Sequence, residues 1–504
     1  MNALPIRRVR FAATAVVLSL AGAQAPAAAD DKGGPRQMAP ETVVVPHKSE
    51  SFSPDPSYEE KPYNVEDQLR IYGGKSAVPN PRPMLELGRP LYGSGPLSAP
   101  GTGLGRKNPT DHAFSVYGDW RTAIARNNNG ATRQSVLATR LNLDVDWKIT
   151  GTERVHAFFR PLDHDGRFTG CVRENRGGHC ESRLDAKAEA LFFEGDLGAL
   201  MSGWTDRYQS FDLPFTFGKI PLLFQNGVWL EDAFGGFAFT IPARNSPLLD
   251  ISNMDVTFFA GVDNVDTPGI VDRAGLATKA NRLVGATAFI EANEGYWELG
   301  LARVKPKDDF GNQGYNNAAI AFTRRYGGWL SNSVRLIHNF GQRPVAGLRR
   351  NANGSLLLIE NSLVTHKPLT LVPYLNLFYG NDRPQSVARA VDAGGILKNT
   401  GINFETDGLT GFPKLNDTAN NTYGGALGIQ YLFDLSQQVV AEVAMVRPHG
   451  DTANRGVPGR EIALGLRYQL NLDRAWIFRA DAIVADRAGA RDLSGVRFEL
   501  RRKF

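Results

Sequence analysis

Alternating apolar and polar residues form the main pattern of this chain, and residues 141–149 show it most clearly. A β-strand sends successive side chains to opposite faces, so such alternation predicts a strand with one apolar and one polar face. The apolar positions of this segment are Leu141, Leu143, Val145, Trp147 and Ile149. Asn, Asp and Lys lie between them. The alternation recurs over residues 461–470, and a return strand begins at Trp476.

The connections between the predicted strands alternate between short and long. The short ones lie near Gly151, Asp196, Asn293, Gly327, Lys367, Asp434 and Leu472. The long ones lie near residues 161–183, 207–233, 264–282, 305–316, 341–354, 380–421, 448–459 and 486–494. Counting back from the last strand gives about 18 strands, beginning with residues 114–124. Residues 355–365 alternate poorly, which leaves about 16 strands as the alternative count.

The final strand, residues 495–504, alternates in the same way and ends on Phe504. It resembles the closing strand of Gram-negative outer-membrane β-barrels, a family in which the terminal aromatic residue is part of the signal read by the barrel-assembly machinery. Aromatic residues also cluster beside the predicted short turns, where such a barrel carries its interfacial girdle. The resemblance implies a porin-type fold, all-β and built as a transmembrane antiparallel β-barrel. An edge strand of a soluble sandwich would explain the last strand but not the girdle.

Three regions follow from the composition along the chain. Residues 1–29 read as a signal peptide, with a basic start, a short apolar run and Ala27, Ala28 and Ala29 before the cleavage point. Residues 30–112 are rich in Pro and Gly and are expected to form an extended periplasmic or lumen-plugging segment. Residues 113–504 carry the strand pattern and form the predicted barrel. This order implies export to the outer membrane of a Gram-negative bacterium.

Charge and motifs narrow the range of functions. The net charge is +5, and removing Arg7, Arg8 and Arg10 with the signal peptide leaves 5 − 3 = +2. That balance does not predict binding to nucleic acid. The sequence has none of the motifs of serine hydrolases, zinc proteases, nucleotide-binding loops or haem attachment. We therefore expect no enzymatic activity and no cofactor.

Cys171 and Cys180 are the two cysteines of the chain and lie nine positions apart in a predicted long loop. In an exported protein, two neighbouring cysteines predict a disulfide. The alternative is a metal site formed with His164 or His179, but the spacing matches no zinc pattern. The disulfide is the preferred interpretation, and no metal site is expected.

Candidate pore residues come from two sources. Strand parity places many charged side chains on the face opposite the lipid, and unpaired charges there require water. The candidates from strand parity are Arg121, Arg325, Arg335, Arg467, Arg479, Arg497 and Glu499. Residues 208–232 form the second source, because a long external loop is usually polar and this one is rich in Phe and Leu. An inward-folded constriction loop would bury those residues and bring Asp212, Lys219, Glu231 and Asp232 to the narrowest point. The alternatives are a loop that caps the barrel rim and an extra pair of short strands.

The predicted function is passive diffusion of small hydrophilic solutes through a barrel wide enough for water. The partners expected are outer-membrane lipid, the barrel-assembly machinery and the solutes themselves. One alternative is a substrate-selective or export channel for anionic solutes or oligosaccharides. Another is a structural or adaptor barrel whose N-terminal segment plugs the lumen and binds a periplasmic partner.

Overall fold

The computed structural model describes residues 83–88 and 101–504, apart from residues 165, 175–176, 309–311, 344, 346–348, 366–369, 406–407, 434–435 and 452–456. The predicted signal peptide and most of the predicted N-terminal segment lie outside the described residues. In the part of the chain that is described, no helix has the length and apolar character needed to cross a membrane.

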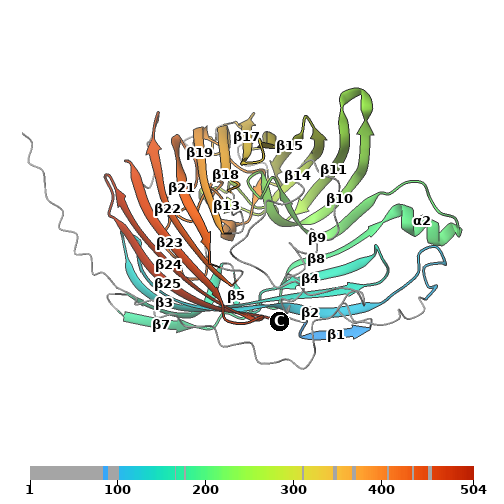
Figure 1. Cartoon of the computed structure of the whole chain (residues 1–504), viewed down its shortest axis with the longest axis horizontal. Helices are drawn as coiled ribbons and strands as arrows, with labels where there is room; N and C mark the ends of the chain where they lie inside the picture. The colour runs from blue at the N-terminus through green and yellow to red at the C-terminus, as the bar shows by residue number, and fades with distance from the viewer. Residues whose placement is uncertain are drawn as a thin grey trace, which may run out of the picture. The chain divides into compact units, whose positions relative to one another are not determined.

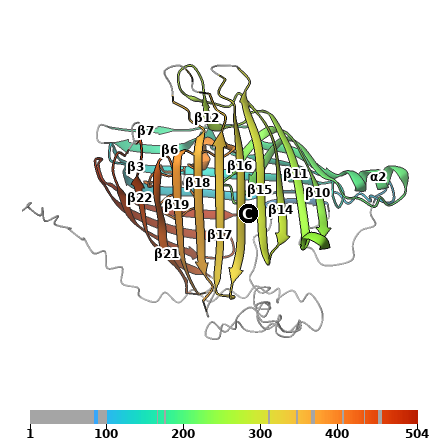
Figure 2. The ribbon, with the colours of Figure 1, turned by 90° about the horizontal axis from the view of Figure 1, so that it is seen from above.

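Antiparallel strands pair edge to edge into a closed ring of 18 (Figure 1). The ring closes because β2 (Ala113–Asn128) pairs with β3 along one edge and with β25 (Leu493–Lys503) along the other. Figure 2 shows β14 to β19, β21 and β22 side by side in this wall. The remaining ring strands, in order, are β3 (Arg133–Lys148), β4 (Arg154–Phe159), β8 (Ala188–Asp196), β9 (Pro214–Phe224), β10 (Leu230–Ser246), β11 (Ile251–Asp263), β14 (Asn281–Ala292), β15 (Gly295–Pro306), β16 (Tyr315–Tyr326), β17 (Leu330–Phe340), β18 (Asn353–Leu363), β19 (Leu371–Arg383), β21 (Thr422–Leu432), β22 (Gln437–Pro448), β23 (Glu461–Asn471) and β24 (Trp476–Arg487). The predicted all-β barrel of about 18 strands is confirmed.

The two faces of the wall differ as the alternation predicts. Large apolar side chains on the outer face stay exposed, while their neighbours in sequence are buried toward the interior. In β23, for example, Leu464 is 54% exposed and Ala463 is 1% exposed. Such a row of exposed apolar residues around a ring suits contact with lipid. Other exposed members are Ile124, Leu137, Leu301, Leu427, Val443, Val484, Val496 and Phe498.

The two ends of the ring have different connections. At the end we call the turn end, strands are joined mainly by tight turns such as residues 149–153, 293–294 and 327–329. At the opposite, loop end, the longest connections are residues 160–187 and 384–421. The predicted short turn at Asp196 is wrong. Asp196 instead caps helix α2 (Leu197–Thr205), whose Ala199 N–H donates to the Asp196 carboxylate at 2.8 Å.

Within the described residues, five short strands lie in the loop-end connections 160–187 and 264–280, and a sixth precedes β2. The predicted loop 161–183 contains β5 (Asp163–His164) and a hairpin of β6 (Arg167–Glu174) and β7 (Gly177–Glu181). The hairpin extends the wall, because β6 pairs with β3 beyond the end of β4. β12 (Thr267–Val271) pairs with β13 (Ala277–Thr278) in their own small sheet. β1 (Leu85–Gly88) pairs with the turn end of β2.

A disulfide joins Cys171 in β6 to the directly opposite Cys180 in β7, as the sequence predicted. The two residues are cross-strand partners, so the bond ties the two arms of the hairpin together. Closing a short loop contributes stability mainly by restricting the unfolded chain.

Candidate functional site

A long segment between β19 and β21, residues 384–421, runs inside the ring, and we call it the inner loop. It contains β20 (Ala388–Arg389) and the short helix η4 (Val391–Ala393). Apolar side chains fix it against the inner wall. Those that are almost fully buried are Val387, Ala388, Ile396, Leu397, Phe404, Leu409, Leu415 and Ala419. Burying these apolar side chains inside the barrel gives a lower free energy than leaving them exposed to water.

The first anchor of the inner loop is β10 and the turn before it. β20 pairs in parallel with Leu230 and Glu231 of β10. The buried Arg389 guanidinium donates to the Glu231 carboxylate at 3.2 Å and also to the carbonyl of Gly227. Lys398 forms an ion pair with the same carboxylate. Glu231 therefore holds two cations of the inner loop, which is a stronger arrangement than one exposed pair.

The second anchor is Glu442 of β22, on the far side of the ring from β10. Its carboxylate accepts hydrogen bonds from the backbone N–H groups of Ile402 and Asn403, at 2.8 and 2.9 Å, and from the Asn403 side chain at 2.8 Å. Tyr374 of β19 donates a fourth at 2.5 Å. Gly401 lies directly against this carboxylate, because an added Cβ atom would lie 2.2 Å from a Glu442 oxygen and would displace it.

The third anchor is a cluster of arginines on β23, β24 and β25. Asp481 binds Arg467 and Arg497 at 2.7 Å each and Arg479 at 2.8 Å. Glu405 of the inner loop reaches the same cluster, 2.6 Å from Arg467 and 3.4 Å from Arg479. The five groups sum to 3 − 2 = +1. The cluster thus presents a net positive charge on the inner wall.

Electrostatics favours the charged form of Glu405. Burial alone would raise the pKa of its carboxyl group, but the guanidinium groups of Arg467 and Arg479 outweigh burial and lower the pKa. The inner loop is therefore bound to the wall through an ionised carboxylate.

The fourth anchor brings the inner loop to β2 and β25. Asn127 donates to the Thr410 carbonyl at 2.7 Å, and Phe412 lies 5.4 Å from the Arg497 guanidinium. Leu409 is buried in a small apolar cluster with Ala123 and its neighbours on β3. Because β10, β22 and β2 are well separated around the ring, the inner loop crosses the interior rather than following one wall.

A fifth contact joins the inner loop to the 160–187 connection. Asp392 forms an ion pair with Arg160 and lies 4.0 Å from Arg140. Burial would raise the pKa of Asp392, but Arg160 and Arg140 together lower it. Arg160 is also 2.9 Å from Glu189, so positive and negative groups alternate along this side of the interior.

The predicted constriction loop at residues 208–232 is wrong. Residues 214–224 form β9 of the ring, and a tight turn leads directly into β10. The apolar residues of this segment lie on both faces of the wall, because Trp229 is fully buried inside and its carbonyl accepts from the Val387 N–H of the inner loop at 2.7 Å. Phe217, for instance, is 50% exposed on the outer face. The inner loop at residues 384–421 takes the place that the prediction gave to this segment.

The four candidate residues of that segment therefore do not meet at one site. Asp212 is exposed in the connection from α2 to β9, at the turn end and away from the inner loop. Lys219 lies 3.8 Å from Glu189. Asp232 is buried and accepts from the Asp266 N–H at 2.8 Å. Of the four, Glu231 is the one that binds the inner loop directly.

The candidates from strand parity lie at several heights of the wall. Arg467, Arg479 and Arg497 meet in the cluster described above. Arg121 of β2 binds Glu499 of β25 at 2.9 Å, a pair that joins the two strands closing the ring. The remaining two candidates do not join the inner loop anchors. Arg335 is buried, and its guanidinium lies 2.8 Å from the Glu360 carboxylate. Arg325 is exposed at the turn end of β16.

Several inner-loop ligands were not foreseen. They are Asp392, Lys398, Asn403 and Glu405, whereas their wall partner Glu442 is one of the charged residues that strand parity places on the lumen face. The available signal was the length of the 380–421 connection together with its buried-type residues, the same reasoning that was applied to residues 208–232. Within the described residues, no group of three or more His, Cys, Asp or Glu side chains could hold a metal ion.

Comparisons with known proteins agree with this architecture. No model of a protein family and no curated protein matches the sequence. Among solved structures, OpdK of Pseudomonas aeruginosa with vanillate matches at 13% identity and a TM-score of 0.50, covering 78% of this chain and 98% of that one. A second structure, OccK1 (OpdK) of the same organism, matches at 12% identity with the same TM-score and coverage. The likeness is one of fold. The chain has the closed barrel of these proteins.

Proposed function

We propose that this chain is an outer-membrane channel through which small hydrophilic solutes diffuse passively. The observation that carries the proposal is the inner loop, held in the middle of an 18-strand ring by charged and polar wall residues. A ring of this size is wide enough for an aqueous passage, and a loop across it sets the narrowest point. The apolar outer face then contacts lipid.

The proposed orientation puts the turn end in the periplasm and the loop end outside. Bacterial barrels have short periplasmic turns and longer external loops, which is the asymmetry seen here. The inner loop then enters the barrel from outside, and solutes meet it on the way in. We also propose that residues 30–112 form either a periplasmic segment or a plug of the lumen. The described portion of these residues includes Asn108, which donates to Glu153 of a turn-end connection at 2.8 Å.

The test is conductance in planar bilayers with the purified full-length protein. We expect discrete single-channel steps that scale with salt concentration, since ions cross with their hydration water. A folded, heat-modifiable barrel that never conducts would contradict the proposal. It would instead support the structural or adaptor barrel.

A channel selective for anionic solutes is the second candidate, and one observation favours it. The cluster of Arg467, Arg479 and Arg497 keeps one positive charge after Asp481 and Glu405 are counted. Charge at a narrow passage acts on every permeating ion. The matching OpdK structure contains vanillate, but at 13% identity that likeness concerns fold. Reversal potentials in a KCl gradient distinguish the candidates, because a selective channel prefers chloride and a general pore does not.

A further inference from the structure

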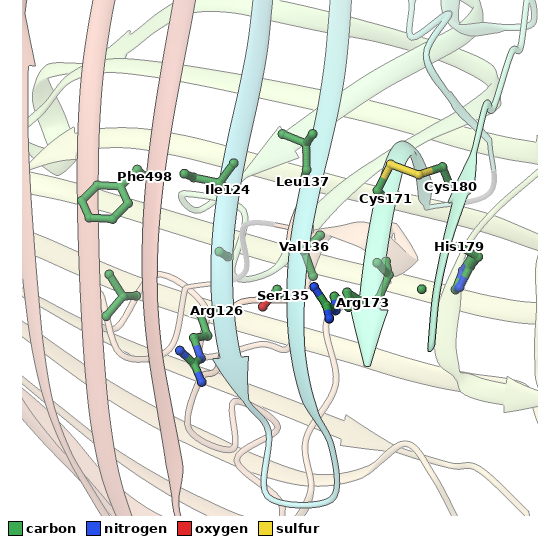
Figure 3. Close-up of a pocket in the computed structure, with 14 residues that line it drawn as sticks. Ile124, Arg126, Ser135, Val136, Leu137, Cys171, Arg173, His179, Cys180 and Phe498 are labelled. Carbon is green, nitrogen blue, oxygen red and sulfur yellow. A yellow bond between two sulfur atoms is a disulfide. The ribbon is translucent and has the colours of Figure 1, made fainter. Parts of the chain in front are cut away.

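The outer wall carries a groove of about 700 Å³ at the loop end of β25, β2, β3, β6 and β7. Its exposed lining side chains point outward, because Ile124 and Leu137 share the strand parity of the outer face, whereas the intervening Val136 packs inside with Leu409. Cross-strand register places the outward-facing lining residues in two rows that run around the wall (Figure 3). The rows differ in chemistry, and this difference identifies an occupant.

The row nearer the turn end is apolar. Its members are direct cross-strand partners on five neighbouring strands, so their side chains share one face. They are Phe498, Ile124, Leu137, Cys171 and Cys180. Ile124 is 52% exposed and Leu137 45% exposed. The disulfide forms one end of this apolar row and holds β7 against β6, so that β7 borders the groove.

The row nearer the loop end is cationic. Its successive partners are Val496, Arg126, Ser135, Arg173 and Gly178. Arg126 and Arg173 are both exposed and flank Ser135, and Gly178 leaves space beside them. The nearby acidic groups are engaged elsewhere or face away. Glu181 binds Arg183, and Glu174 has the opposite strand parity from Arg173.

Spacing matches the two rows to the two parts of a lipid. Rows two residues apart are separated by roughly 7 Å, and strands two apart by roughly 10 Å. Two guanidinium groups at that spacing suit a headgroup with more than one anionic oxygen. The apolar row below them suits an acyl chain. The arginines lie close to the end of β2, the depth at which headgroups meet a membrane-spanning wall.

We propose that this groove binds a phosphate-bearing anionic lipid of the outer leaflet, with the phosphate between Arg126 and Arg173 and an acyl chain along Ile124 and Leu137. This inference rests on the membrane location and orientation of the proposed function. It concerns a site on the opposite face of the wall from the solute passage.

The experiment is native mass spectrometry of the full-length protein, with bisphosphorylated lipid A as the probe and its dephosphorylated form as the comparison. We expect lipid A adducts on the parent protein, and a roughly tenfold loss of them in Arg126→Gln/Arg173→Gln, since two ion pairs are removed. The matched control is Arg282→Gln/Lys305→Gln. These two residues are an exposed cross-strand pair at the loop end of β14 and β15, outside the groove.

Equal losses in the groove and control variants would overturn the proposal, because they would show general charge attraction only. Equal binding of dephosphorylated lipid A would overturn it as well. A third variant, Leu137→Trp, fills the apolar row without removing charge and is expected to reduce the adducts too. Heat-modifiability on gels confirms folding of each variant. Single-channel conductance tests the proposed function separately, so a negative result in lipid binding and a negative result in conductance can be told apart.

Discussion

Replacing Glu442 by Ala should release the middle of the inner loop. The carboxylate accepts three hydrogen bonds from inner-loop groups, the N–H of Ile402, the N–H of Asn403 and the Asn403 side chain. A hydrogen bond to a charged group contributes about 1.5–3 kcal/mol, and water in the lumen recovers part of each when it breaks. We therefore expect a net loss of about 3 kcal/mol of docking free energy, or roughly a hundredfold rise in the undocked population.

The assay is single-channel recording, with Glu298→Ala as the control. Glu298 is an inward-facing carboxylate of β15 that lies 3.9 Å from Arg335, and Arg335 keeps Glu360 when Glu298 is removed. Glu442→Ala should add long-lived states of higher conductance, because the undocked loop no longer crosses the lumen. The control should keep the parent conductance. The same conductance and noise in Glu442→Ala and the parent, with both barrels folded, would refute the anchoring role of Glu442.

Three further predictions concern charge, pH and orientation. Asp481→Asn raises the net charge of the arginine cluster from +1 to +2, so the reversal potential in a KCl gradient should move toward the chloride equilibrium potential. The control is Asp486→Asn, which removes a carboxylate paired with Arg460 at the exposed loop end and should leave the reversal potential unchanged. The lowered pKa of Glu405 means that its carboxylate supports docking at neutral pH and loses this role as the pH falls through that lowered value. Conductance should hold constant down to the ordinary glutamate pKa of about 4.3 and change only below it, and a change that begins at higher pH would oppose this assignment. Ala274→Cys at the loop end should react with an impermeant thiol reagent on intact cells, whereas Arg474→Cys at the turn end should not, and the reverse pattern would invert the orientation.

The strands were predictable because lipid and lumen impose opposite demands on alternate residues. Leu464 and Ala463 show this directly, one exposed on the outer face and the other buried inside. Tight turns were predictable where a short polar run separates two alternating segments. The connection at Asp196 was not, since nine residues of helix follow the cap in a segment that lacks a strong amphipathic pattern.

The inner loop was misassigned for a physical reason. Apolar residues between strands indicate that a segment packs against something, but not whether it is itself a strand. Residues 214–224 lie on the wall, whereas Ile396, Leu397 and Phe404 lie inside the ring. Long-range partners decided the outcome, among them Glu231 with Lys398 and Glu442 with Asn403. Such pairs span 167 and 39 positions of sequence, beyond any local pattern.

The most direct test of the inner loop as the constriction is its removal. Deleting residues 396–416 joins Gly395 to Asp417, which are already neighbours, since the Gly395 N–H donates to the Asp417 carboxylate at 2.6 Å. The strand ladder of the ring does not depend on the deleted residues, so the barrel should remain heat-modifiable. We predict a higher single-channel conductance and permeation by larger neutral solutes in liposome swelling. A folded deletion variant with the parent conductance and the parent size limit would contradict the account.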